Sequence, residues 1–217
     1  MPRAVSFSGL MTYEKCPAQY DYKYNKGLKG DPPGPAAARG TRIHKSIEEY
    51  YLNDGELDHE IPMQIRRAVC QPKDVCEEVY PELEFAFTEK WEQTEFEADD
   101  AFVRGFMDNV FVLPDSLLVH EYKTGSVYPE HDDQKALYGL ASLILFKEFD
   151  TVEVAGVYLD KKKVVPTRFD RSSIMPMKMM WTKRINRVHL GDYPARPGFH
   201  CRWCPASKLK GGPCLLG

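Results

Sequence analysis

The chain has 217 residues, of which 43 % are hydrophobic and 28 % are charged, with a formal net charge of −3. This composition allows one substantial core and excludes a globally disordered chain. No apolar run approaches the roughly 18 residues of a membrane-spanning helix, and residues 1–10 lack the apolar region of a secretory signal. We therefore expect a cytoplasmic protein without a membrane partner, in which six cysteines serve as thiols or ligands rather than disulfides.

In the first part of the chain, apolar residues at helical spacing predict helices, and proline and glycine residues predict the loops between them. Ser8 is the predicted N-cap of the first helix, and Pro17 predicts a break in that helix beside Cys16. His44 lies beside the apolar stripe of the second helix, and Pro72 is predicted to interrupt a third. The predicted helices cover residues 6–24, 41–52 and part of 61–79, and the loops between them cover residues 26–39 and 53–60.

The middle of the chain shows the alternation typical of β-strands. Glu84, Ala86 and Thr88 share one face of the first predicted strand, and Pro114 with Asp115 predicts a tight turn between the next two. The predicted strands cover residues 82–88, 101–113, 117–123, 152–159 and 164–169, and the later helices cover 131–149 and 173–190. This order predicts an α/β fold with a mixed central β-sheet flanked by helices.

The predicted hairpin over residues 103–125 carries charges that could bind a metal ion. Asp108 lies on its first strand, and Glu121 and Lys123 lie two residues apart on the second, so they share a face. Carboxylate oxygens suit Mg²⁺ or Mn²⁺, and a lysine beside the metal can position a water molecule. A surface hairpin with solvated charges fits this short pattern equally well, so the hairpin alone leaves both interpretations open.

Four cysteines could bring the two ends of the chain together. They are Cys201, Cys204 and Cys214 in the tail and Cys16 near the N-terminus. Four sulfur ligands suit zinc, and iron–sulfur clusters are also held by thiolates, so the residue types alone do not choose between the two. Cys70 and Cys76 have no partner motif and are interpreted as structural thiols.

Six short motifs follow one another in a recognisable order. They are C-P-A-Q-Y at Cys16–Tyr20, G-T-R-I-H at Gly40–His44, G-F-M-D at Gly105–Asp108, E-Y-K at Glu121–Lys123, Q-K-A-L-Y at Gln134–Tyr138, and C-R-W-C with a later cysteine at Cys201–Cys214. This order resembles the PD-(D/E)XK nuclease superfamily. More closely, it resembles the RecB-like branch, with the nuclease domains of RecB and AddB and the iron–sulfur CRISPR-associated exonucleases. Met107 stands where the family has a proline, a departure that removes no ligand.

The resemblance implies a restriction-endonuclease-like core and a role for each matching position. The implied ligands of one or two Mg²⁺ or Mn²⁺ ions are His44, Asp108, Glu121 and the main-chain carbonyl of Tyr122. Lys123 would position the attacking water, and Gln134 and Tyr138, four apart on a helix, would face the DNA and the catalytic groups. Glu84 would be an additional acidic position. The implied ligands of a 4Fe–4S cluster are Cys16, Cys201, Cys204 and Cys214; the wide gap before Cys214 keeps structural Zn²⁺ as the alternative.

The resemblance also implies one RecB-like nuclease domain over residues 1–217. It would comprise an N-terminal helical part (1–60), a catalytic sheet core (82–169) and a cysteine-rich tail (191–217) that closes the cluster. The implied activity is metal-dependent hydrolysis of DNA, by an exonuclease rather than an endonuclease, on single strands or DNA ends without base specificity. A helicase or recombination protein would be a further partner, in a phage, in DNA repair or in CRISPR adaptation.

The alternative is a non-catalytic module of the same fold that binds DNA or a helicase. Intact Asp108, Glu121 and Lys123 argue against it. The basic residues that could follow a phosphate backbone are Arg39, Arg42, Lys161–Lys163, Lys178, Lys183, Arg184 and Arg187.

Overall fold

The computed structural model describes residues 3–216; Met1, Pro2 and Gly217, which the predicted domain bounds include, lie outside the described residues. Five strands form one sheet in the order β1-β2-β3-β4-β5. β3 and β4 are parallel, and the other neighbouring pairs are antiparallel. The strands are β1 (Glu78–Phe87), β2 (Val103–Val112), β3 (Leu117–Lys123), β4 (Thr151–Tyr158) and β5 (Lys163–Asp170). The sheet is therefore mixed, as the sequence predicts.

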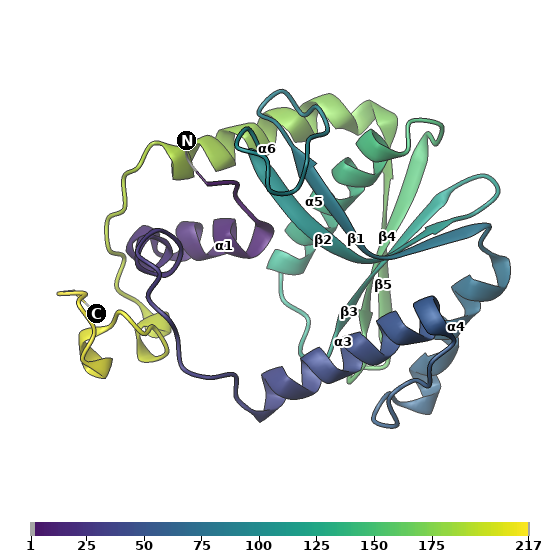
Figure 1. Cartoon of the computed structure of the whole chain (residues 1–217), viewed down its shortest axis with the longest axis horizontal. Helices are drawn as coiled ribbons and strands as arrows, with labels where there is room; N and C mark the ends of the chain where they lie inside the picture. Colours follow the sequence, from purple (N-terminus) through teal and green to yellow (C-terminus); the bar gives the residue numbers. More distant parts are fainter. Residues whose placement is uncertain (1–2, 217) are drawn as a thin grey trace.

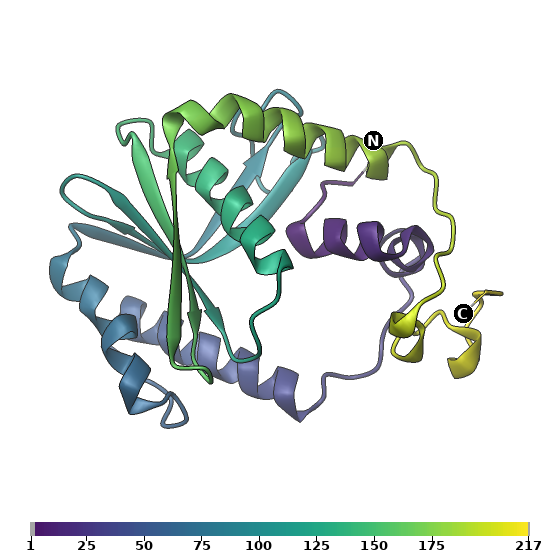
Figure 2. The same ribbon diagram turned by 180° about the vertical axis from the view of Figure 1, so that it is seen from behind.

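Helices cover both faces of the sheet (Figures 1 and 2). They are α1 (Phe7–Lys15), α2 (Pro17–Tyr20), the π-helical turn η1 (Asp21–Asn25), α3 (Pro35–Asn53), α4 (Met63–Val75), α5 (Glu130–Leu145) and α6 (Ile174–His189). Short 3₁₀ turns follow at Arg171–Ser173, Phe199–Arg202 and Lys208–Lys210. Residues of α1, α5 and α6 share one apolar cluster with the sheet, and residues of α3 and α4 share a second. The α/β class expected from the sequence is confirmed.

The parallel pair β3–β4 explains the position of α5. Parallel neighbours need a crossover connection, which a helix usually provides. Leu137, Leu140 and Leu143 of α5 are fully buried in the larger apolar cluster, so this face holds the helix against the sheet. The polar residues at the start of α5 are thereby fixed beside the end of β3.

The first helical segment differs in its cap from the sequence prediction. The N-cap of α1 is Ser6, whose side chain accepts a hydrogen bond from the Gly9 amide. Ser8 lies inside the helix, so the prediction that it is the cap is wrong by one half-turn. The predicted break at Pro17 is confirmed, because α1 ends before Cys16 and α2 begins with Pro17 at its first position.

Three other boundaries also differ. The predicted loop 26–39 ends at Gly34, because Pro35 is favourable at the first helical position and the alanines after it are strong helix formers. Pro72 does not interrupt α4 but lies buried in its last turn, and its carbonyl accepts from the Cys76 amide. β1 begins at Glu78 rather than at residue 82, since the long β2 strand pairs with it as far as Val112.

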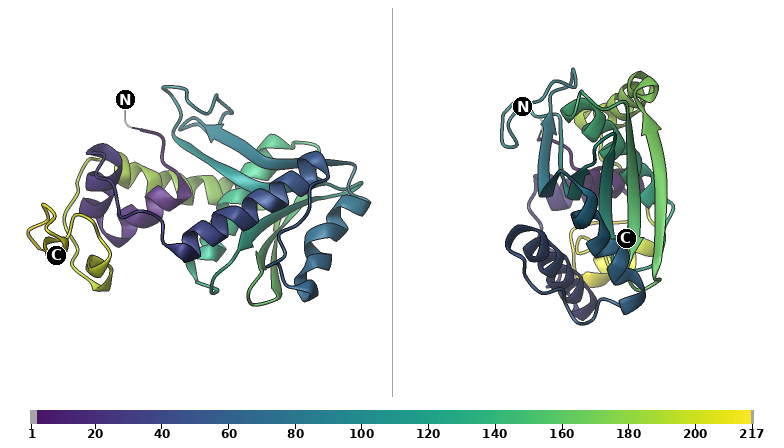
Figure 3. Two further views of the ribbon diagram at one scale, coloured as in Figure 1. Left: turned by 60° about the horizontal axis from the view of Figure 1, so that its bottom comes forward. Right: turned by 90° about the vertical axis from the view of Figure 1, so that its right-hand side faces the viewer.

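The C-terminal tail packs against the N-terminal helices, away from the sheet (Figures 1 and 3). The Tyr13 hydroxyl of α1 donates to the carbonyl of Asp192, 3.2 Å away, and Lys210 forms an ion pair with Asp31 in the loop before α3. The two ends of the chain therefore form one unit beside the sheet. Within residues 3–216, no helix has both the length and the apolar character needed to cross a membrane.

A matched pair of leucine substitutions tests whether α5 is held by its apolar face. Leu140 is 0 % exposed and Leu52 on α3 is 55 % exposed. Leu140→Ala is expected to lower the free energy of unfolding by about 2–5 kcal/mol because it removes buried apolar surface and leaves a cavity. Leu52→Ala should change it by less than about 0.5 kcal/mol. Urea denaturation measures both; equal losses would contradict the packing described here.

Candidate active site

Asp108 lies where β2 and β3 part. The two strands pair from Val112–Leu117 to Asn109–His120, and no pairing continues beyond that point. The Asp108 side chain instead accepts a hydrogen bond from the Tyr122 main-chain amide at 2.7 Å. A carboxylate thus takes the place of a backbone carbonyl between the strands, which fixes its direction and opens room for ligands at the end of the hairpin.

Three residues from three elements converge on this opening. His44 of α3, Glu82 of β1 and Asp108 of β2 each offer a ligand atom, and these atoms lie within 4.8 Å of one another. The His44 Nδ1 is 3.4 Å from Asp108 Oδ1. Each of the three side chains is half-buried, so the group borders solvent and remains accessible to an ion.

Four further residues form a hydrogen-bonded network on the other side of Asp108. Lys123 donates to Glu121 Oε1 at 2.7 Å and to Gln134 Oε1 at 2.9 Å. The Gln134 amide group donates to Glu121 Oε1 and to the Tyr138 hydroxyl, both at 2.9 Å. Gln134 therefore fixes the lysine, the glutamate and the tyrosine together, and α5 completes the site that β3 begins.

Burial and neighbouring charge shift the acid–base behaviour of the site. Burial, with the charge of Asp108 adding to it, raises the pKa of Glu121 from 4.5 to about 7 although Lys123 opposes the shift. The same two causes, in the same order, raise the pKa of Glu82 to about 7. Burial lowers the pKa of His44, but its hydrogen bond to Asp108 and the charges of Asp108 and Glu121 outweigh this, so the pKa is raised. The site therefore disfavours further negative charge, and Glu82 and Glu121 hold their protons to a higher pH than exposed glutamates do.

The residues present fit a divalent cation. The second carboxylate oxygen of Glu121, Oε2, is buried without a hydrogen-bond partner among the described residues. Such an orphaned oxygen is costly unless a cation or a polar ligand meets it. Carboxylate oxygens suit Mg²⁺, and carboxylates together with imidazole also suit Mn²⁺.

Two motif glycines allow close packing around the site. A Cβ at Gly40 would lie 3.2 Å from Thr124 Oγ1, so glycine lets α3 approach the end of β3 one turn before His44. A Cβ at Gly105 would lie 2.8 Å from the ring of Phe85, which in turn packs edge-on against Tyr138. Both glycines therefore bring functional side chains within reach of the hairpin.

The acidic residue that β1 contributes is Glu82, not Glu84. Glu82 has a positive φ of 47° and makes no ladder pair with Asp108, although its neighbours pair on both sides. This local distortion turns Glu82 toward Asp108, whereas Glu84 pairs with Phe106 and is exposed. A regular strand would place both glutamates on one face, so the sequence pattern had no signal that separates them.

Several arginines that were candidates for a phosphate path are already paired. Arg39 binds Glu60 and Asp160, with nitrogen–oxygen distances of 2.6 and 2.9 Å. Arg42 binds Asp58 and Glu60, and Arg184 binds Glu14 and Asp133. These arginines join helices and loops to one another, so they are less available to DNA than the sequence implied.

The four predicted ligand cysteines line one cavity, together with residues of α2 and the tail. They are Cys16, Cys201, Cys204 and Cys214. Main-chain amides of Arg196 and Gly198 donate to the sulfurs of Cys16 and Cys201, each at 3.4 Å. All six cysteines are free thiols, and Cys70 and Cys76 lie apart on α4 and at its C-terminal end. The tail and the N-terminal helices therefore converge at this cluster of thiols.

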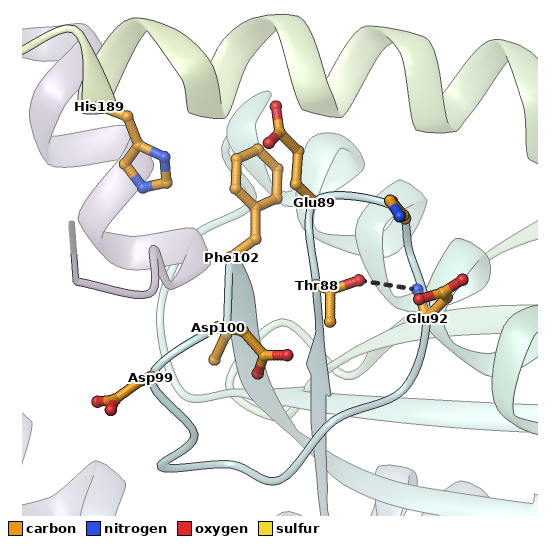
Figure 4. A pocket seen from close by; sticks show the side chains of 9 residues that line it. Thr88, Glu89, Glu92, Asp99, Asp100, Phe102 and His189 are labelled. Atoms are coloured by element: carbon orange, nitrogen blue, oxygen red, sulfur yellow. Dashed lines mark hydrogen bonds between the residues drawn. The ribbon is translucent and has the colours of Figure 1, made fainter. Parts of the chain in front are cut away.

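A larger cavity of about 420 Å³ contains none of the predicted site residues. It lies between the loop after β1, the start of β2 and the end of α6, and is lined by four carboxylates (Figure 4). Those carboxylates point in different directions in Figure 4, and Phe102 packs edge-on against His189 with ring centroids 5.1 Å apart. Without convergent ligands, this cavity does not compete with the hairpin as the candidate active site.

The comparison with known proteins agrees with this arrangement. Residues 4–209 match the sequence model of the PD-(D/E)XK nuclease superfamily, so the chain belongs to that superfamily. A crystal structure of a candidate exonuclease from Eubacterium rectale superposes with a TM-score of 0.57 at 16 % identity, over 99 % of this chain and 89 % of that one. The protein SSO0001 superposes with a TM-score of 0.54 at 12 % identity, over 100 % of this chain and 88 % of that one.

No curated protein matches the chain by sequence. At such low identities the two structures show a shared fold, and the superfamily match supports nuclease activity.

The raised pKa values predict how stability depends on pH without metal. Between 4.5 and about 7 the folded protein binds more protons at Glu82 and Glu121 than the unfolded chain does. Stability is therefore present at low pH and is lost as the pH rises through about 7. Urea denaturation in the presence of a chelator, at pH values from about 5 to 8, should show this decline.

Glu82→Gln removes one of the two groups, so its decline should be shallower than that of the wild type. Glu84→Gln, on the same strand but exposed, is the matched control and should keep the wild-type profile. A Glu82→Gln protein whose stability falls with pH as steeply as the wild type would contradict the raised pKa of Glu82.

Proposed function

We propose that this protein is a divalent-metal-dependent deoxyribonuclease of the RecB-like branch. The observation that carries the proposal is the convergence of His44, Glu82 and Asp108, together with a Glu121 oxygen that is buried and has no hydrogen-bond partner among the described residues. Superfamily membership supports the nuclease class. We further propose exonucleolytic action on single-stranded DNA or DNA ends, with residues 1–217 as one nuclease domain of three parts (1–60, 82–169 and 191–217).

The proposed metal ligands are His44, Asp108, Glu121 and the main-chain carbonyl of Tyr122, with Glu82 added on geometric grounds. A bound Mg²⁺ or Mn²⁺ would act as a Lewis acid toward the phosphate and would lower the pKa of water. Because the carboxyl groups of Glu82 and Glu121 retain protons up to about pH 7, a cation must displace protons there. Metal affinity should therefore rise with pH.

The protein groups around the metal position the reactants. The Lys123 ammonium is held by Glu121 and Gln134 and can orient the attacking water toward phosphorus. The water loses one proton as its oxygen forms a bond to phosphorus, the bond from phosphorus to the leaving oxygen breaks, and the leaving oxygen takes up one proton. Burial raises the pKa of Tyr138, so its hydroxyl stays protonated and can donate to a phosphate oxygen.

A comparison of four proteins tests the catalytic assignment. Asp108→Ala removes the carboxylate shared by both halves of the site, so cleavage of labelled single-stranded DNA with Mn²⁺ should fall at least about a hundredfold. Glu82→Gln should lower activity and weaken Mn²⁺ binding measured by calorimetry. Glu84→Gln, whose side chain is exposed, should retain wild-type cleavage and wild-type affinity for Mn²⁺.

Two other outcomes of the cleavage assay would contradict these assignments. Equal cleavage by the wild type and Asp108→Ala would identify a contaminating nuclease and refute the proposed site. A loss in Glu84→Gln, with Glu82→Gln unaffected, would restore the sequence-based assignment of the β1 acid. The wild type should retain cleavage after repeated purification.

We propose that the four tail and N-terminal cysteines hold a 4Fe–4S cluster. Ligands of a tetrahedral zinc ion, each about 2.3 Å from the metal, lie about 3.8 Å apart. Among the described residues, no three cysteine sulfurs lie within 4.8 Å of one another. This spacing favours a larger group over a single zinc ion, and the amides that donate to Cys16 and Cys201 suit cluster sulfurs.

Three further proposals concern the location of the protein, its partners and the structural role of the cluster. A cluster with thiolate ligands requires a reducing compartment, which supports a cytoplasmic location. The RecB-like branch also implies DNA as the partner and a helicase or recombination protein as an additional one. Within the protein, the cluster would fix the tail to the N-terminal helices.

Metal analysis after anaerobic purification tests the cluster. We expect iron and sulfide in about equal amounts with broad visible absorption, and loss of both in Cys201→Ser. Cys70→Ser is the matched control, since Cys70 lies on α4 outside the cluster, and it should keep the iron. Zinc in place of iron, with cleavage retained, would refute the cluster and leave the nuclease proposal intact.

A further inference from the structure

An aromatic pocket includes Phe106, which lies two residues before Asp108 on β2. It has a volume of about 220 Å³ and lies between the N-terminal segment, η1 and β2. The N-terminal segment runs beside the start of β2, where Val5 forms a bridge with Val103 (Figure 1). Its lining includes four aromatic side chains and two arginines: Tyr20, Tyr24, Phe96, Phe106, Arg3 and Arg104.

The aromatic rings form two pairs. Tyr20 and Tyr24 have ring centroids 4.9 Å apart, and Phe96 and Phe106 have centroids 4.8 Å apart. Phe106 is 43 % exposed, whereas the next residue along β2, Met107, is fully buried. Phe106 therefore packs against Phe96 and still leaves part of a flat apolar ring exposed beside the pocket.

The charge of the pocket favours an anion. Among the described residues that line it, none is acidic, in a chain whose net charge is −3. The Arg104 guanidinium lies 4.6 Å from the centre of the Phe96 ring and pairs with Glu97, whose side chain is 79 % exposed. Arg3 donates only to the carbonyl of Tyr24, at 3.4 Å. Arg3 is exposed, so a phosphate group can approach it from the solvent side. The Arg104 side chain is only 16 % exposed and also donates to the Phe96 carbonyl at 2.7 Å, so it adds positive charge to the pocket wall.

The position of Phe106 relates the pocket to the proposed cleavage site. Phe106 lies two residues before Asp108, which is about 7 Å along an extended strand. Neighbouring nucleotides of a single strand are separated by a comparable distance. Aromatic faces beside cationic groups are the usual means by which proteins bind single strands without reading their sequence.

We propose that this pocket binds one unpaired nucleotide next to the scissile phosphate, with its base against Phe106 and its phosphate near Arg3 and Arg104. The inference rests on the proposed nuclease function and deepens it, because a base within a duplex cannot present its face to Phe106. The pocket thus gives a physical reason for a preference for single strands. Phe106 is a specificity-determining residue of the substrate site.

Binding measurements separate stacking from a structural role. In the Asp108→Ala protein, Phe106→Ala should weaken binding of a short single-stranded oligonucleotide by on the order of tenfold, and Phe106→Trp should retain it. Binding of duplex DNA should be unchanged. Met179→Ala, which removes a 70 % exposed apolar side chain on α6, is the control and should leave both affinities unchanged.

Base removal gives a second, independent readout. An abasic site moved along the oligonucleotide should weaken binding at one position, and at that position Phe106→Ala should cause no additional loss. A 2-aminopurine at the same position should show a change in fluorescence on binding to the Phe106 protein and not to Phe106→Ala.

The subsite is refuted if Phe106→Ala changes single-strand affinity less than about twofold, or weakens single-strand and duplex binding equally. Additive losses from the abasic site and the substitution would also refute it. These results are independent of the nuclease proposal, which depends on cleavage by the wild type and its loss in Asp108→Ala.

Discussion

The hydrogen bond from the Tyr122 amide to Asp108 is the interaction on which the site depends. At 2.7 Å it replaces a ladder bond at the point where β2 and β3 stop pairing. The parted strands allow a carboxylate, an imidazole from α3 and an acid from β1 to meet in one place. If the ladder continued, Asp108 would project from a regular strand, and these ligands would have no common centre.

The second constraint is the electrostatic cost of burying acids together. Glu121 is buried, and burial with the charge of Asp108 raises its pKa to about 7. Lys123 and the amide of Gln134 bind one of its oxygens, and the other is left without a partner among the described residues. A site arranged in this way is less stable than an apolar core, and a divalent cation would relieve both the repulsion and the unmet oxygen.

The two ends of the chain meet beside the sheet, and the N-terminal end also lines the pocket next to β2. α1, α2 and the C-terminal tail meet at the four cysteines, and the same N-terminal region supplies Tyr20, Tyr24 and Arg3 to the aromatic pocket beside β2. A structural group at the cysteines would therefore hold the region that lines the proposed path of the substrate.

The sequence by itself determined the order of the elements, the turn between β2 and β3, and the motif residues that converge at the hairpin. These features depend on local chemistry: proline and aspartate in a turn, apolar periodicity in α5, and residue types at short spacing. The N-cap of α1 is Ser6 and not Ser8, and α3 begins at Pro35 and not at residue 41, because several nearby residues could serve in each position. Only the tertiary structure decided that Glu82 rather than Glu84 joins His44 and Asp108, since a local backbone distortion overrides alternation.

The tertiary structure also decided which charges are free to act. Arg39, Arg42 and Arg184 resemble phosphate ligands in the sequence, yet each forms ion pairs with residues distant in the chain. The sequence also gave no sign of the aromatic pocket, because its rings come from α2, η1, β2 and the loop before β2. Ion pairs and packing between distant segments depend on the folded backbone. The spacing of residues along the sequence does not reveal them.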